Sequence, residues 1–139
     1  MHDRLSVHCV CFRDAGLREL PNHWSDLDVR RVSLYNGLIE NEGLAAAQAA
    51  LRTGDYQLET ITHNFPPYGQ QLDANDVSWE ASQEKLNRLI ADAKTLGARS
   101  IQIFTGGGHG TLTWEDAAER FSTAVAPCAA RLARSNCGR

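Results

Sequence analysis

Long apolar runs are missing from this sequence of 139 residues. No stretch approaches the roughly 20 apolar residues that a helix needs to span a bilayer. Residues 1–12 lack the longer apolar region and the small-residue cleavage site of a signal peptide. An excess of positive charge is also lacking, because the net charge is −3. We therefore expect a cytoplasmic protein that binds neither nucleic acid nor a membrane surface.

Several catalytic and binding motifs are absent as well. The four cysteines (Cys9, Cys11, Cys128 and Cys137) form no C-x-x-C pair, which excludes a thioredoxin-like motif and a standard zinc knuckle. In a reducing cytosol we interpret them as small buried thiols. The sequence also contains no G-x-S-x-G elbow, no G-x-G-x-x-G after its first β-rich run and no Walker motif.

The sequence does contain an alternation of short β-rich runs with helical stretches. The β-rich runs cover residues 5–12, 31–35, 56–62 and 100–105. No two-residue hairpin turn joins one run to the next, which argues against antiparallel pairing. This alternation is typical of βαβ units and a parallel sheet.

Helices are predicted in the segments between and after these runs, over residues 21–27, 41–52, 79–96 and 114–132. Gly54 and Gly97 stand where left-handed C-terminal caps belong. Thr113 is a natural N-cap for the last helix, with Asp116 three residues on to return the hydrogen bond.

Four strand–helix repeats predict an α/β fold, a (β/α)₄ unit in one domain over residues 1–139. Right-handed crossovers place all the helices on one side of a curved sheet, as in the front half of a (β/α)₈ barrel. The alternative is a flavodoxin-like open sheet with helices on both faces. That fold needs a phosphate loop after the first strand, and residues 13–16 make a poor one.

Half a barrel leaves its first and last strands as open edges and its inner face exposed. Unpaired backbone groups and apolar inward residues favour association. Two copies can close an eight-stranded barrel around a two-fold axis. We therefore predict a homodimer, or a dependence on a separate chain that supplies the second half.

Two stretches of the sequence resemble a known family. Residues 96–107 (LGARSIQIFTGG) are similar to the passage from the third helix to the fourth strand in the sugar phosphate isomerase/epimerase group, the xylose-isomerase-like TIM barrels. Residues 114–121, followed by 130–133, resemble the fourth helix of that group, and the loop 63–69 is in its style. The resemblance covers nearly the whole chain, but only as the N-terminal half of a longer protein. In the family the metal carboxylates and histidines lie mainly on strands five to eight, so they are not carried over.

The resemblance implies a sugar isomerase or epimerase acting on a small polyhydroxylated or sugar-like compound. The family's usual chemistry is proton abstraction next to a carbonyl, helped by a divalent metal ion such as Mn, Mg, Zn or Co. The alternative is a non-catalytic split or degenerate half-barrel that binds a small ligand or a partner protein. A third interpretation is a truncated product of a full enzyme.

Function in such barrels gathers at the C-terminal ends of the strands. His63 and His109 each follow a predicted strand, and neutral imidazoles there can bind a divalent metal. Histidines occur at strand ends in this half of the related endonuclease IV-like barrels. The alternative is that both are polar loop residues facing water.

The glycine run at residues 106–110 precedes a helix, where backbone N–H groups and the helix dipole favour an anion such as a sugar phosphate. Gly107 and Gly108, with Tyr68 in the long loop after the third strand, are the candidate substrate-binding residues. The alternative is a flexible turn.

Two polar residues inside predicted strands are the candidate catalytic groups. His8 shares a face with Ser6 and points into the barrel interior if the Val and Cys face meets the helices. Glu59 shares a face with His63, and a carboxylate there suggests an interior polar site. The alternative for Glu59, which we favour, is a strand mouth open to water or a salt bridge.

Overall fold

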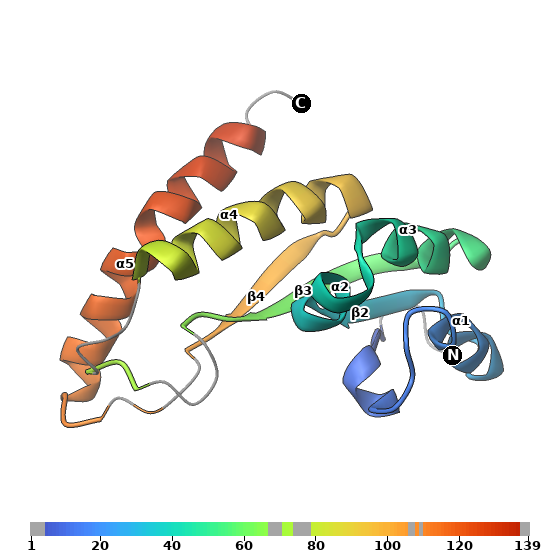
Figure 1. Cartoon of the computed structure of the whole chain (residues 1–139), viewed down its shortest axis with the longest axis horizontal. Coiled ribbons are helices and arrows are strands. Elements are labelled where there is room, and N and C mark those ends of the chain that lie inside the picture. The colour runs from blue at the N-terminus through green and yellow to red at the C-terminus, as the bar shows by residue number, and fades with distance from the viewer. Residues whose placement is uncertain (1–4, 67–70, 74–78, 106–107, 109, 137–139) are drawn as a thin grey trace. The chain divides into compact units, whose positions relative to one another are not determined.

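The computed structural model describes residues 5–66, 71–73, 79–105, 108 and 110–136. The strands in these ranges are β1 (Val7–His8), β2 (Arg31–Tyr35), β3 (Gln57–Asn64) and β4 (Ser100–Phe104). The α-helices are α1 (Leu20–Asp26), α2 (Asn36–Glu42), α3 (Leu44–Thr53), α4 (Trp79–Leu96) and α5 (Trp114–Asn136), and a 3₁₀ helix, η1 (Cys9–Phe12), follows β1 (Figure 1). No helix within these ranges combines the length and apolarity that crossing a membrane requires.

The strands form one sheet in the order β1-β2-β3-β4. β1 pairs with β2, and β2 with β3, in parallel. β4 runs the same way as β3, because Arg99 N donates to Leu58 O at 3.1 Å near their starts and Phe65 N donates to Phe104 O at 2.7 Å near their ends. The predicted α/β fold with a four-stranded parallel sheet is therefore confirmed.

The chain divides into two compact units, which are described separately below. One contains residues 1–63 and 91–102, and the other contains residues 64–90 and 103–139. Each unit draws on two separate segments of sequence, because α4 and β4 pass from one unit into the other.

The first unit has its apolar core between the strands and the helices α1 to α3. In Figure 1, α2 and α3 lie along the same side of β2 and β3. Trp24 of α1 is fully buried and meets the ring of Tyr56 edge-on, with centroids 4.9 Å apart. The other fully buried apolar side chains of this unit are Leu17, Leu20, Val32, Leu34, Ala47 and Ile61.

The helix predicted over residues 41–52 proves to be two helices that meet at Gly43. Gly43 has φ 94° and ψ 154°, a backbone conformation that interrupts the helix. Residues other than glycine rarely adopt it. The predicted left-handed cap at Gly54 is wrong, because φ is −130° there and the positive φ of 53° falls on Asp55. Gly97 has the predicted positive φ, 71°.

The first strand is much shorter than the predicted 5–12, and the reason is a side-chain cap. His8 Nδ1 accepts the backbone N–H of Val10 at 3.1 Å, which turns the chain out of the strand and into η1. Cys9 Sγ then accepts the N–H of Tyr35 at 3.1 Å. Competition between a local side-chain bond and the sheet ladder therefore ends β1 after two residues.

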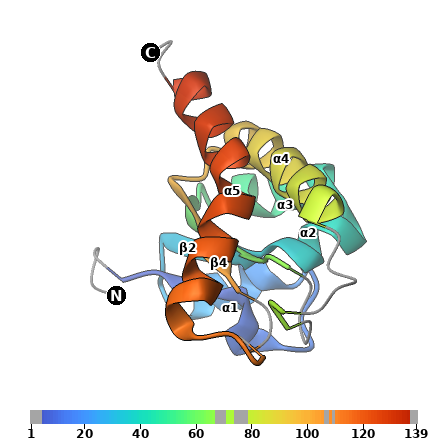
Figure 2. The same cartoon turned by 90° about the vertical axis from the view of Figure 1, so that its left-hand side faces the viewer.

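In the second unit, the first part of α4 and the helix α5 lie side by side in both views (Figures 1 and 2). Gln83 Nε2 on α4 donates to Ala124 O on α5 at 2.8 Å. The buried ring of Phe65 lies 5.9 Å from that of Trp79 and 5.8 Å from that of Phe121, measured between centroids. The core of this unit therefore joins the end of β3 to both helices.

The N-terminus of α5 is capped as the sequence predicts. Asp116 N donates to Thr113 Oγ1 at 3.2 Å, and the hydroxyl of Thr113 donates to Asp116 Oδ2 at 2.7 Å.

Candidate functional site

A β-bulge decides which side chains face the two sides of the sheet. Val32 pairs with Leu58, but the next residue of β2, Ser33, pairs with Thr60. Glu59 is therefore an extra residue in β3 without a partner in β2. Because strand side chains alternate, this bulge keeps Thr60 and Thr62 on the same face as Ser33.

One face of the sheet in the first unit carries mainly hydroxyl groups. We call it the hydroxyl face, and it consists of Ser6, His8, Ser33, Thr60, Thr62 and Ser100. Three side-chain hydrogen bonds run across it: Ser6 Oγ to Ser33 Oγ at 3.4 Å, His8 Nε2 to Thr62 Oγ1 at 3.0 Å and Thr60 Oγ1 to Ser100 Oγ at 2.9 Å. The expectation of mainly apolar inward residues is therefore wrong for this part of the sheet.

The other face carries the apolar side chains that meet the helices. Val32, Leu34, Leu58 and Ile61 are all buried there. His63 alternates with Ile61 and is buried with them, 5% exposed. The sheet therefore has a helix face and a hydroxyl face, with His8 on the latter, as the sequence predicts.

The bond between His8 and Thr62 spans the width of β2. Neighbouring strands lie about 4.8 Å apart, so β1 and β3 would be about 10 Å apart in a flat sheet. An imidazole and a threonine hydroxyl meet at 3.0 Å over that width when both side chains lean over β2 toward each other. The bond therefore joins β1 and β3 on the hydroxyl face.

His8 is held as a neutral imidazole with a defined tautomer. Its Nδ1 accepts from Val10 N, so the proton of the neutral ring is on Nε2, which donates to Thr62 Oγ1. Burial lowers the pKa of His8 below its ordinary value of 6.5. At neutral pH this side chain therefore presents an N–H donor, and not a basic lone pair, to the hydroxyl face.

Cys9 lies beside His8, with Sγ 3.8 Å from Nδ1. Burial raises the pKa of the Cys9 thiol, outweighing the N–H of Tyr35, which lowers it. The pair therefore holds a thiol, and not the thiolate that a cysteine nucleophile needs. Of the described cysteines, Cys9 and Cys128 are buried and Cys11 is exposed, so the expectation of buried thiols is wrong for Cys11.

The candidate metal ligand His63 is fixed from its Nδ1 side. Asn36 is buried at the start of α2, and its Nδ2 lies 3.2 Å from His63 Nδ1 and 3.0 Å from Glu40 Oε1. A carboxylate only accepts, so Glu40 fixes the amide with its N–H groups toward both partners. The amide therefore donates to His63 Nδ1, which places the proton of the neutral ring on Nε2.

Glu59 lies near the start of β3, whereas His63 lies near its end. Its carboxylate meets Arg31 Nη1 at 3.1 Å and Arg99 Nη1 at 3.3 Å. The side chain of Glu59 is 18% exposed. The structure thus does not bring the two candidate catalytic residues together, and the salt bridge that we favoured for Glu59 is present.

The end of the glycine run is joined to the loop after β3 in the second unit. Asp73 Oδ2 accepts the N–H and the hydroxyl of Thr111, each at 2.7 Å, and Leu72 N donates to Gly108 O at 3.1 Å. Gly110 has φ +65°, and a Cβ there would collide with the Asp73 carboxylate. The hydrogen bonds from Thr111 lower the pKa of Asp73.

This join bears on the predicted anion site. A carboxylate against Gly110 disfavours a second anion close to it. Of the candidate substrate-binding residues, Gly108 is exposed at this join. Gly107, Tyr68 and the candidate metal ligand His109 lie outside the described residues.

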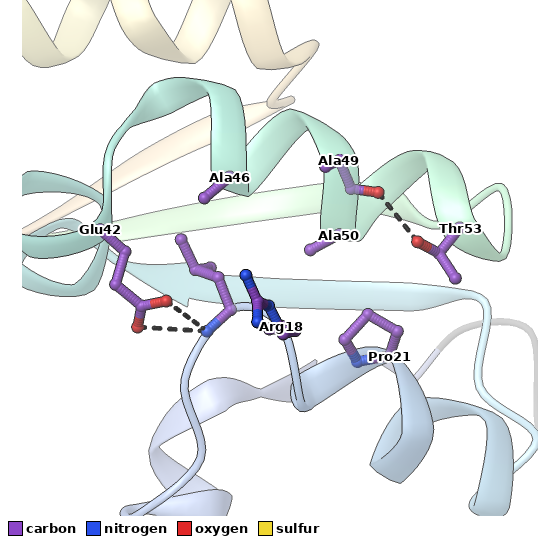
Figure 3. A pocket seen from close by; sticks show the side chains of 8 residues that line it. Arg18, Pro21, Glu42, Ala46, Ala49, Ala50 and Thr53 are labelled. Atoms are coloured by element: carbon purple, nitrogen blue, oxygen red, sulfur yellow. Dashed lines mark hydrogen bonds between the residues drawn. The ribbon is translucent and has the colours of Figure 1, made fainter.

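A cavity of about 420 Å³ lies between the segment before α1 and the helix α3 (Figure 3). Small side chains of α3, Ala46, Ala49 and Ala50, line it. Both carboxylate oxygens of Glu42 accept the N–H of Leu17, at 3.0 and 3.2 Å, and these are dashed lines in Figure 3. The Glu42 carboxylate thus links the segment before α1 to the end of α2. Because this carboxylate has a structural role, we do not assign the functional site to the cavity.

The described residues do not by themselves fit a divalent metal ion. Within them, no three His, Cys, Asp or Glu side chains come close enough to share one. His63 Nδ1 is taken by Asn36, so a metal at Nε2 would require the other tautomer and a reversed amide. A divalent metal ion in this chain would therefore depend on ligands outside the described residues.

Three residues of the site were not singled out from the sequence. Ser33 and Thr62 alternate with apolar residues inside their strands, and this period of two was a usable signal. Asn36 directly follows β2, which is the position where functional side chains gather in parallel α/β folds.

Comparisons with known proteins identify a fold and no family. No protein-family model matches the chain, and no curated protein matches it. Among solved structures, the chain is similar to the protein SMc04130 from Sinorhizobium meliloti 1021, with a TM-score of 0.70 and 19% sequence identity. The match covers 93% of this chain and 47% of that one, so the chain spans about half the length of its structural neighbour. At this identity the likeness shows the fold alone.

Proposed function

We propose that this chain is one half of a sugar isomerase/epimerase-like barrel that binds a small polyhydroxylated or sugar-like compound on its hydroxyl face. The observation that carries the proposal is the row of hydroxyl groups on one face of the sheet, with the His8 N–H beside them. Hydroxyl groups both donate and accept, as do the hydroxyl groups of a polyol. The proposal includes a cytoplasmic location for the protein.

Closure of the barrel is the second part of the proposal. Strands β1 and β4 are the edges of the sheet, and the chain spans 47% of its structural neighbour. A second copy of the chain, or a separate second-half chain, would pair with these edges and enclose the hydroxyl face. The enclosed ligand would then lose its contact with bulk water, which strengthens each hydrogen bond to it.

The chemistry implied by the family resemblance is proton transfer next to a carbonyl, assisted by a divalent metal such as Mn, Mg, Zn or Co. Because Nδ1 of His8 is occupied and its Nε2 donates to Thr62 Oγ1, we assign His8 the role of a donor to a substrate oxygen that takes the place of the Thr62 hydroxyl. Glu59 would act only if its two arginine partners released it. His63 and His109 remain the proposed metal ligands of this chain, although His63 would have to leave Asn36 and the helix face to reach a substrate on the hydroxyl face. Tyr68, Gly107 and Gly108 are its proposed substrate contacts.

The alternative function is a non-catalytic half-barrel that binds a small ligand or a partner protein. The observation that favours it is the pairing of Glu59 with Arg31 and Arg99, which holds this carboxylate in ion pairs and not as a free base. Both functions share binding on the hydroxyl face, and they differ in turnover and in bound metal.

Titration with a panel of free aldoses and alditols, followed by ¹H–¹⁵N NMR spectra, tests the shared step. We expect the largest shift changes at the amides of His8, Ser33 and Thr62. Ser33→Ala should weaken binding, whereas Ser122→Ala, on α5, should leave it unchanged. Changes spread over the surface, or no change with any member of the panel, would contradict binding on this face.

Native mass spectrometry with and without a chelator separates catalysis from plain binding. The enzymatic proposal predicts one bound divalent metal per site that chelator removes, and its loss in His63→Ala and in His109→Ala. Metal content that is the same in both variants as in the unaltered protein would remove these histidines as ligands.

A further inference from the structure

We propose that His8 is a proton-operated latch, which holds η1 against the sheet only while its imidazole is neutral. The inference does not depend on any ligand of the hydroxyl face. It concerns the junction where β1 ends and η1 begins.

The latch is a chain of hydrogen bonds with a single direction. Val10 N donates to His8 Nδ1 at 3.1 Å, His8 Nε2 lies 3.0 Å from Thr62 Oγ1, and Thr62 Oγ1 donates to Leu34 O at 3.4 Å. A backbone N–H can only donate and a backbone carbonyl can only accept, so both ends of the chain are fixed. The arrangement is complete with one proton on the imidazole, at Nε2.

A second proton on His8 breaks one end of this chain. Protonated Nδ1 becomes a donor and faces the N–H of Val10, so two donors meet where a donor met an acceptor. The Nε2 end survives, because it donates in both states. Protonation thus removes the N-terminal cap of η1 and leaves the ring attached to Thr62.

Other contacts hold η1 besides this cap. Cys9 Sγ accepts from Tyr35 N at 3.1 Å, and the ring of Phe12 stacks on His23 of α1 with centroids 4.7 Å apart. Loss of the cap therefore loosens the first turn of η1, while these contacts retain the helix.

Other titratable side chains near this junction respond differently. On the elements around His8 and η1 they are Cys9, Cys11, Arg13, His23, Asp26, Arg31, Tyr35, Glu59 and His63. Arg31 and Glu59 are paired with each other, and His63 lies on the helix face. His23 is exposed against Phe12. Its protonation would strengthen its contact with the Phe12 ring, so it would hold η1 rather than release it.

Hydrogen exchange of the Val10 amide, read by NMR on the full chain and expressed as a protection factor, tests the latch. We expect protection to fall about tenfold, the loss of one hydrogen bond, as the pH is lowered from about 7.5 through the titration of His8, whose pKa lies below 6.5. The midpoint should coincide with the His8 titration in the same sample. In His8→Asn the side-chain oxygen can still cap Val10 N but does not titrate, so protection should stay constant over this range.

His23→Gln is the matched control, and it should retain the fall in protection. A fall that disappears in His23→Gln, or that persists unchanged in His8→Asn, would overturn the proposal. A ¹⁵N shift that places the neutral proton on Nδ1 of His8 would also overturn it, because that tautomer cannot accept from Val10.

Discussion

His8 on β1 and Thr62 on β3 meet across the whole width of β2, with 3.0 Å between Nε2 and Oγ1. This one bond links three consecutive strands on the hydroxyl face. It also fixes the orientation of an imidazole that could otherwise rotate toward water. The first prediction follows from removing it.

Thr62→Val should lower the free energy of unfolding by about 1 to 2 kcal/mol, because it keeps the shape of the side chain but leaves a partly buried N–H of His8 without its acceptor. Thr60→Val is the matched control. Its hydroxyl meets Ser100 in an exposed bond, so the loss there should be smaller, about 0.5 kcal/mol. Urea denaturation measures both. Equal losses of unfolding free energy in the two variants would mean that the bond to His8 contributes no more to stability than the exposed bond to Ser100.

Stability should fall on the acid side of neutrality because of His8. Burial lowers its pKa in the folded state, so the unfolded chain binds this proton more readily than the folded chain does. The contribution of His8 is therefore complete above pH 6.5 and is lost as the pH falls from 6.5 toward the folded pKa. Urea denaturation at several pH values across this range measures the free energy of unfolding. This free energy should change less with pH in His8→Asn than in the unaltered protein. Parallel curves would contradict the pKa shift.

Gly110→Ala should destabilise the second unit by about 1 kcal/mol or more, because φ is positive there and the new Cβ would meet the Asp73 carboxylate. Gly108→Ala is the control from the same loop, since a Cβ at Gly108 meets nothing within 4 Å. Thermal unfolding compares the two variants. If both lower the melting temperature equally, the loop is sensitive to alanine in general and not to this close approach.

Glu59→Gln should cost about 0.5 to 1 kcal/mol of stability, because it weakens ion pairs with Arg31 and Arg99 that are only partly screened by solvent. The cost should shrink in high salt. The same variant should leave the His8 titration and polyol binding unchanged, because the Glu59 carboxylate is held by the two arginines and not by the hydroxyl groups. Loss of binding without loss of stability would instead support a catalytic or binding role for Glu59.

The alternation of strands and helices was readable from the sequence because apolar and β-branched residues recur at strand and helix spacing. The last helix and its Thr113 cap were predicted for the same local reason. The end of β1 was not predictable in this way, since His8 can either continue a strand or cap the next turn. The break at Gly43 was hidden by a helix-favouring composition on its C-terminal side.

The site was harder to predict than the fold. The place of His8 on the hydroxyl face, with Ser6 and away from Val7, followed from strand alternation alone. The role of Glu59 depended on two arginines, one 28 and one 40 residues away in sequence, and no local pattern reports such a contact. The Asn36 amide that fixes His63 was likewise invisible, because its effect depends on which of its atoms faces the ring.

The mass of the native assembly tests the central claim most directly, that the hydroxyl face is the inner wall of a barrel completed by a second chain. The measurement is native mass spectrometry of the protein isolated from its own cells, so that any second-half chain is retained. The account predicts a mass of twice 15.3 kDa, or 15.3 kDa plus that of a second chain. A stable monomer of 15.3 kDa would contradict it.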